Sequence, residues 1–171
     1  MTQTVDLNTF IQRARELGAA EAKLIDAKTV VTAPWVRMKC HYGCGGYGRT
    51  LCCPPYTPTP EETQQIIDCY SRALLVHSLV HPTITPIVSQ LEREIFLSGF
   101  HKALAFGEGS CRLCRPEPCD LERCRHPREA RPSMVGCGID VYATVRANGF
   151  PIQVVTDRSD PTNTYGLVLI D

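Results

Sequence analysis

The chain has no excess of charge of either sign. Its 171 residues include 18 lysines and arginines and 18 aspartates and glutamates, so the formal net charge is zero. A nucleic-acid-binding protein usually carries a basic excess, and we therefore expect no nucleic-acid partner. No stretch approaches the roughly 20 consecutive apolar residues of a membrane span, and the first residues, MTQTVDLNTFIQRARELG, lack the layout of a secretion signal. We therefore expect a cytoplasmic protein that does not associate with membranes.

The sequence also lacks a phosphate-binding loop and a dinucleotide fingerprint. What it has in excess is cysteine. Of its 10 cysteines, five lie within residues 40–69 and five within residues 111–137. Because the cytosol keeps thiols reduced, clustered cysteines there indicate metal ligands better than they indicate disulfides.

The periodicity of apolar residues predicts alternating helices and strands. Two segments dense in cysteine, glycine and proline, 39–60 and 107–138, interrupt this pattern. The order predicts an α/β or α+β fold, in which a mixed sheet has flanking helices and the two cysteine loops bind metal in a single domain over residues 1–171. We expect helices at 7–17, 60–70, 84–99 and 139–148, and strands within 22–38 and at 73–80, 102–106, 152–155 and 165–170.

The second cysteine loop contains Cys111, Cys114, Cys119 and Cys124, at spacings that let four thiolates surround one metal centre. Four-sulfur sites suit zinc or iron–sulfur clusters. Zinc sites typically pair two Cys-x-x-Cys knuckles, whereas this run has a single knuckle, so its spacing favours iron–sulfur. The arginines around this loop could neutralise a thiolate cluster, dock an acidic redox partner, or simply form a solvated face balanced by nearby carboxylates.

The first cysteine loop offers Cys40, Cys44 and one of the adjacent pair Cys52 and Cys53. Its glycines let the backbone approach a cofactor closely. The fourth ligand is open at this stage: an iron without a fourth protein ligand could bind substrate, and a structural metal could equally hold the loop. The candidates for this fourth position are Cys69, Cys137, the other member of the pair, and His41.

Two blocks of sequence resemble DUF2284, a family of predicted metal-binding proteins from prokaryotes. The blocks are KCHYGCGGYGRTLCCPPYTPTPEET and CRLC followed by CRHPREARPSMVGCGIDV, and the resemblance covers about residues 20–155. By this resemblance Cys53, which precedes two prolines, is the ligand and Cys52 is additional. The resemblance implies metal binding, in the manner of an iron–sulfur protein in an anaerobic setting, and no particular reaction.

Together these features predict an iron–sulfur protein with two 4Fe–4S clusters and a role in electron transfer, which requires a redox partner protein. Two alternatives remain open. One is an enzyme that uses an open iron site on the Cys40, Cys44 and Cys53 cluster, and the other is a zinc-stabilised interaction module without redox function.

Overall fold

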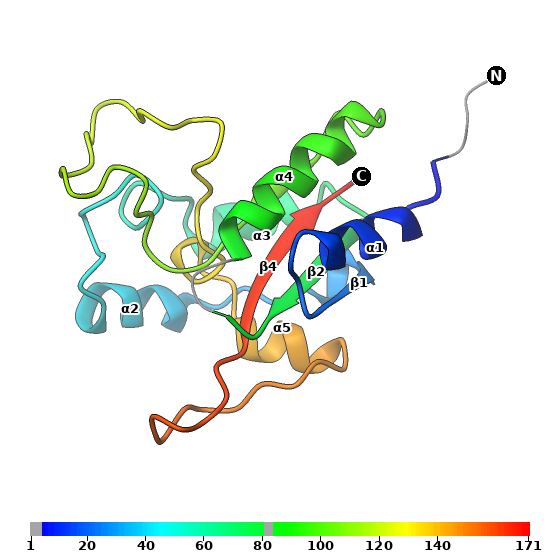
Figure 1. Cartoon of the computed structure of the whole chain (residues 1–171). Coiled ribbons are helices and arrows are strands. Elements are labelled where there is room, and N and C mark those ends of the chain that lie inside the picture. The colour runs from blue at the N-terminus through cyan, green and yellow to red at the C-terminus, as the bar shows by residue number, and fades with distance from the viewer. Residues whose placement is uncertain (1–4, 81–83) are drawn as a thin grey trace.

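A computed structural model describes residues 5–80 and 84–171, and its arrangement is shown in Figure 1. Five α-helices and four strands make up the regular structure of these residues, and two short 3₁₀ turns join them. The helices are α1 (Asn8–Glu16), α2 (Pro34–Gly43), α3 (Pro60–Ile67), α4 (Ile84–Leu97) and α5 (Val141–Ala147). The strands are β1 (Glu21–Asp26), β2 (Arg72–Ser78), β3 (Leu104–Phe106) and β4 (Thr164–Leu169), and the turns are η1 (Ala27–Thr29) and η2 (Val135–Cys137).

The four strands form one sheet in the order β1-β2-β4-β3. Each of the three pairings is antiparallel: Leu24 faces Leu74, Leu75 faces Leu167, and Ala105 faces Val168. The α+β class predicted from the sequence is therefore confirmed. In detail, the sheet is antiparallel throughout rather than mixed.

Helices cover both faces of the sheet. On one face, Leu74 and Val76 of β2 pack with the buried side chains of α1 and α4. On the other face, Leu75 packs with a cluster that includes Ile67 of α3 and Val145 of α5. Because side chains alternate between faces along a strand, burial on both sides explains why β2 reads as a continuous apolar run.

Helix α3 begins as its sequence predicts. The Thr59 hydroxyl accepts a hydrogen bond from the Glu62 amide at 3.2 Å, and the Glu62 carboxylate accepts one from the Thr59 amide at 2.8 Å. This reciprocal pair is a capping box, with Pro60 at the first helical position. The helix ends at Ile67, somewhat before the predicted end at residue 70.

Two predicted strands are absent from the described residues. Residues 34–38, predicted as part of a strand, begin α2, because Pro34 occupies the first turn of this helix. Helix α2 extends to Gly43, so Cys40 lies on a helix and not in a loop. Residues 152–155 pair with no strand, and the side chains of Val154 and Val155 are exposed.

Backbone hydrogen bonds close a loop in each cysteine-rich segment. Residues 107 and 133 form a parallel bridge, in which the Met134 amide donates to the Gly107 carbonyl at 2.9 Å. In the first segment, the Gly48 amide donates to the Pro54 carbonyl at 2.7 Å. The two segments lie at the same end of the molecule, beyond the start of α4 (Figure 1). No helix in the described part of the chain is both long enough and apolar enough to cross a membrane.

Candidate metal centre

Backbone hydrogen bonds bring α2 and η2 together, although more than 90 residues separate them in sequence. The Ala33 amide donates to the Gly138 carbonyl at 2.9 Å, and the Asp140 amide donates to the Val31 carbonyl at 2.8 Å. Helix α2 consequently lies against η2. This pairing places Cys40, on α2, in the same region as Cys137, on η2.

The first thiol group consists of Cys40, Cys44, Cys53 and Cys137. Cys40 and Cys53 are 7% and 6% exposed and Cys137 is fully buried, whereas Cys44 is exposed at the end of α2. Burial raises the pKa of Cys40, and the charges of Cys44 and Cys53 raise it further. Burial also raises the pKa of Cys137 to about 12, with smaller contributions from Cys53 and Cys40. The Cys40 thiol also donates to the Val135 carbonyl of η2 at 3.8 Å, so Cys40 lies beside the turn that carries Cys137.

Arg37 supplies positive charge to the first thiol group. Its charge opposes the effect of burial by lowering the pKa of both Cys40 and Cys137. Its guanidinium is held in place because Nη1 donates to the carbonyls of Thr57, at 3.2 Å, and Pro58, at 2.7 Å. The sequence analysis missed this residue. Its spacing of three from Cys40 places it one helical turn away, a signal that becomes readable once residues 34–43 are recognised as a helix.

The second thiol group joins the two cysteine-rich segments: it consists of Cys52, Cys111 and Cys124. Cys52 and Cys111 interact through their side chains, which raises the pKa of Cys52 and lowers that of Cys111. The charge of Cys124 also raises the pKa of Cys52. Cys52, which the family resemblance marks as additional, thus interacts with the second cysteine-rich segment.

Ser110 links the two thiol groups. Its hydroxyl oxygen lies 3.4 Å from the sulfur of Cys53, and its neighbour in sequence is Cys111. It also lies so close to Gly46 that a Cβ on that glycine would come within 1.9 Å of the Ser110 hydroxyl and 3.6 Å of the Cys44 sulfur. The Gly46 amide itself donates to the Cys44 sulfur at 3.4 Å. The backbone at Gly46 therefore approaches Ser110 more closely than a larger residue would allow.

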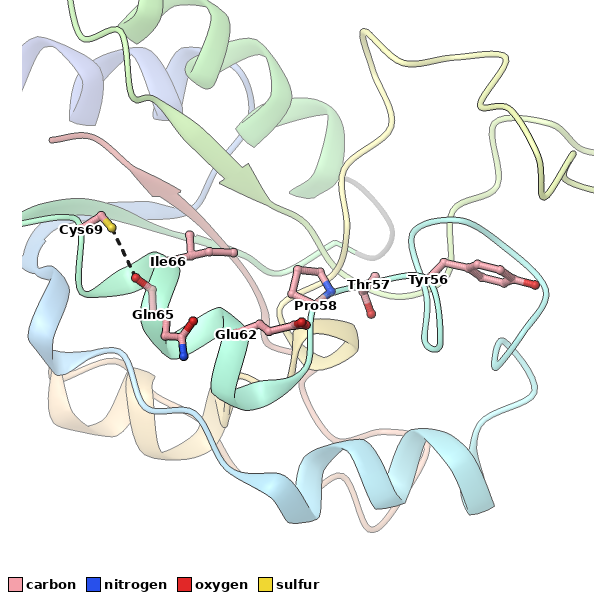
Figure 2. Close-up of a pocket in the computed structure, with 7 residues that line it drawn as sticks. All are labelled: Tyr56, Thr57, Pro58, Glu62, Gln65, Ile66 and Cys69. Atoms are coloured by element: carbon pink, nitrogen blue, oxygen red, sulfur yellow. Dashed lines mark hydrogen bonds between the residues drawn. The ribbon is translucent and has the colours of Figure 1, made fainter.

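The remaining predicted ligands lie outside these groups. Cys119 donates to the carbonyl of its neighbour Asp120 at 3.6 Å, and Cys114 is half-buried in the same segment. Cys69 donates to the Gln65 carbonyl at 3.4 Å, at the far end of a surface groove from Tyr56 (Figure 2). This places Cys69 just beyond the end of α3, apart from both thiol groups.

The thiols gather but do not converge as ligands around one point. Across residues 5–80 and 84–171, no three histidine, cysteine or carboxylate side chains form a group that could hold a metal ion as they stand. The chemistry of the donors nevertheless fits a metal centre, because every cysteine is free and soft thiolates favour zinc and iron–sulfur clusters. Thiolates are also the form in which cysteine binds metal, and Arg37 favours that form at two positions.

Comparison with known families identifies the chain. A family model described as predicted metal-binding protein (DUF2284) matches residues 23–170. No curated protein and no solved structure matched. Because the match covers most of the chain, the protein belongs to this family, and the resemblance noted in the sequence is confirmed.

Proposed function

We propose that this member of the predicted metal-binding family holds two 4Fe–4S clusters on its two thiol groups and acts as an electron-transfer or redox accessory protein. When bound, such clusters supply one-electron chemistry. The observation that carries the proposal is the gathering of thiols from two distant segments in adjoining regions, where the Cys53 sulfur lies 3.4 Å from the Ser110 hydroxyl and Cys52 interacts with Cys111. Separate structural zinc knuckles would need no such contact between segments.

In this proposal Cys137 is the fourth ligand of the first centre. It is buried, and it interacts electrostatically with Cys40 and Cys53. Cys69, the other candidate for this position outside the first segment, lies just beyond the end of α3, where its thiol donates a hydrogen bond to the Gln65 carbonyl. A centre with four protein ligands has no open position for substrate, so this assignment favours electron transfer over an enzyme with an open iron site.

The second centre takes Cys111 and Cys124 of the second thiol group and adds Cys114, which lies outside that group but forms the Cys-x-x-Cys knuckle with Cys111. We assign its fourth ligand to Cys52 in place of Cys119. Cys52 interacts with both Cys111 and Cys124. The Cys119 thiol instead donates to the carbonyl of the adjacent Asp120. The two segments would then be joined through a shared cofactor.

Anaerobic purification followed by iron and acid-labile sulfide analysis tests the proposal. We expect about eight iron atoms and about eight sulfides per chain, as two four-iron clusters contain. Zinc without sulfide would contradict the proposal and support a zinc-stabilised interaction module. An electron-transfer role further requires that the iron-loaded protein is reduced by dithionite and reoxidised reversibly, which visible absorption would follow.

Serine variants test the assignment of ligands. Cys52→Ser and Cys137→Ser should each lower the iron content by about one cluster, whereas Cys119→Ser should retain both clusters. Cys69→Ser is the matched control, because it removes a thiol of the same chain that lies apart from both groups. Loss of a cluster in Cys119→Ser together with full occupancy in Cys52→Ser would reverse the assignment of the second centre.

A further inference from the structure

A cavity of about 620 Å³ lies between α4 and the second cysteine-rich segment. Small-molecule sites usually have volumes of this order, about 300–1,000 Å³. Its walls include Thr85 and Ser89 of α4 and Ser110 and Cys111 of the segment. The cavity is therefore of a size to accept a small organic molecule, and it reaches the second thiol group at Cys111.

Three arginines give this cavity its charge. Arg93 comes from α4, and Arg112 and Arg128 come from the segment that faces it. All three are exposed, and within residues 5–80 and 84–171 no carboxylate lies at ion-pair distance from any of them. In a chain with a net charge of zero, such a concentration of unpaired guanidinium groups creates a local positive potential.

The other charged residues of the wall leave this positive excess in place. Arg131 forms a two-point ion pair with Glu92, with both nitrogen–oxygen distances at 2.7 Å. The Glu129 Oε2 atom lies 3.6 Å from Nδ1 of His126. Glu108 also lines the cavity. The wall as a whole thus carries four arginines against two carboxylates, and the arginine that already has a carboxylate partner is Arg131.

Hydrogen bonds hold the two walls of the cavity together. The Ser89 hydroxyl donates to the Arg128 carbonyl at 3.2 Å, and the Glu108 amide donates to the Thr85 hydroxyl at 3.1 Å. The ion pair between Arg131 and Glu92 adds a third link to α4. Arginines mounted on walls fixed in this way bind an anion with less loss of conformational entropy than arginines on a mobile loop.

We propose that this cavity binds a small organic oxyanion, with a carboxylate or phosphate group recognised by Arg93, Arg112 and Arg128. The planar fork of a guanidinium matches the oxygen atoms of both groups. The hydroxyls of Thr85 and Ser110 can bond further polar atoms of the ligand, and Leu113 offers it an apolar contact. The inference rests on the proposed function in one respect only: a bound ligand lies next to Cys111, a thiol assigned to the second cluster.

The test measures anion binding to the purified full-length chain by calorimetry. The probes are inorganic phosphate and malonate, each at an ionic strength held constant with sodium chloride. We expect one of them to bind the wild-type protein, and the variant Arg112→Gln/Arg128→Gln to bind it at least about tenfold more weakly, because charge-assisted hydrogen bonds are lost. Phosphate binding alone would identify a phosphorylated ligand, and malonate binding alone a carboxylic acid.

The control variant is Arg15→Gln/Arg146→Gln, which removes the same charge from α1 and α5, away from the cavity. It should bind the probe as the wild-type protein does. Absence of binding to the wild-type protein, or equal weakening in both double variants, would overturn the proposal. Iron and sulfide are assayed on the same samples, which separates the two proposals. Anion binding by a protein without sulfide would reject the iron–sulfur clusters and support the anion site. A protein that contains both clusters but binds no anion would support the clusters and reject the anion site.

Discussion

The contact between Gly138 and Pro60 yields the sharpest prediction for stability. Gly138 follows Cys137 directly and has a φ of +80°. A Cβ at this position would lie 2.4 Å from the Cγ, 2.7 Å from the Cβ and 2.9 Å from the Cα of Pro60, the first residue of α3. The variant Gly138→Ala therefore meets two penalties, one from its backbone conformation and one from overlap with α3.

The magnitudes follow from these two causes. A left-handed conformation costs a residue with a Cβ about 1–2 kcal/mol, and overpacking costs about 1–3 kcal/mol. Gly149→Ala is the matched control, because Gly149 has a φ of +77° but a Cβ there would meet only the end of Lys23, at 4.0 Å. The difference between the two variants isolates the overlap, which should lower the midpoint of thermal unfolding by about 2–12 °C more in Gly138→Ala.

Thermal and urea unfolding of the metal-free protein, followed by circular dichroism, measure both variants against the wild type. Adding Pro60→Ala to Gly138→Ala removes the closest atom and leaves the other two, so it should recover part of the lost stability. If Gly138→Ala were no less stable than Gly149→Ala, the close packing of η2 against α3 would be refuted.

Three further variants test the fold around the site. The hydrogen bond from Arg13 holds the pKa of Glu94 below its ordinary value of 4.5. Arg13→Gln should therefore be less stable than the wild type at pH 7, and this difference in stability should shrink as the pH falls through the pKa of Glu94 in the folded protein. Urea unfolding at pH 7 and at pH 3 measures the change. Gly166→Ala should lower stability by about 1–3 kcal/mol, because its Cβ would lie 2.7 Å from a buried valine of α4, and a midpoint in urea equal to that of wild type would contradict this. Arg131→Gln should cost about 1–3 kcal/mol in the same assay, because it leaves the half-buried Glu92 without its charged partner; an unchanged midpoint would show that the ion pair does not stabilise the base of the second segment.

Local signals in the sequence were sufficient for much of the fold. The capping box at Thr59 and the apolar run of β2 each depend on nearby residues, and both elements formed as predicted. Residues 30–38 were misread because Val30 and Val31 favour a strand, whereas Pro34 starts a helix a few residues later. Val154 and Val155 favour a strand too, but residues 152–155 pair with none of the described strands.

The spacing of the cysteines in the sequence could not predict which thiols group together. Cys52 is adjacent to Cys53 in sequence, yet the two side chains meet different residues of the second segment: Cys111 and Ser110, respectively. Neighbouring side chains diverge, as the sequence analysis assumed, but which partner each one meets depends on how residues 107–133 return to the sheet. Tertiary contacts determine this path of the second segment, and no periodic pattern in the sequence predicts it.

The order of the strands has a consequence for synthesis on the ribosome. β4 lies between β2 and β3 and supplies the only link between them in the described sheet, yet it is the last of the four to be translated. The sheet therefore cannot close before residue 169 has left the exit tunnel. Cys137 packs in the same buried cluster as Leu167 and Leu169, so Cys137 reaches its buried position only after β4 has been translated. A metal bound by Cys137 would then be acquired after β4 has been translated.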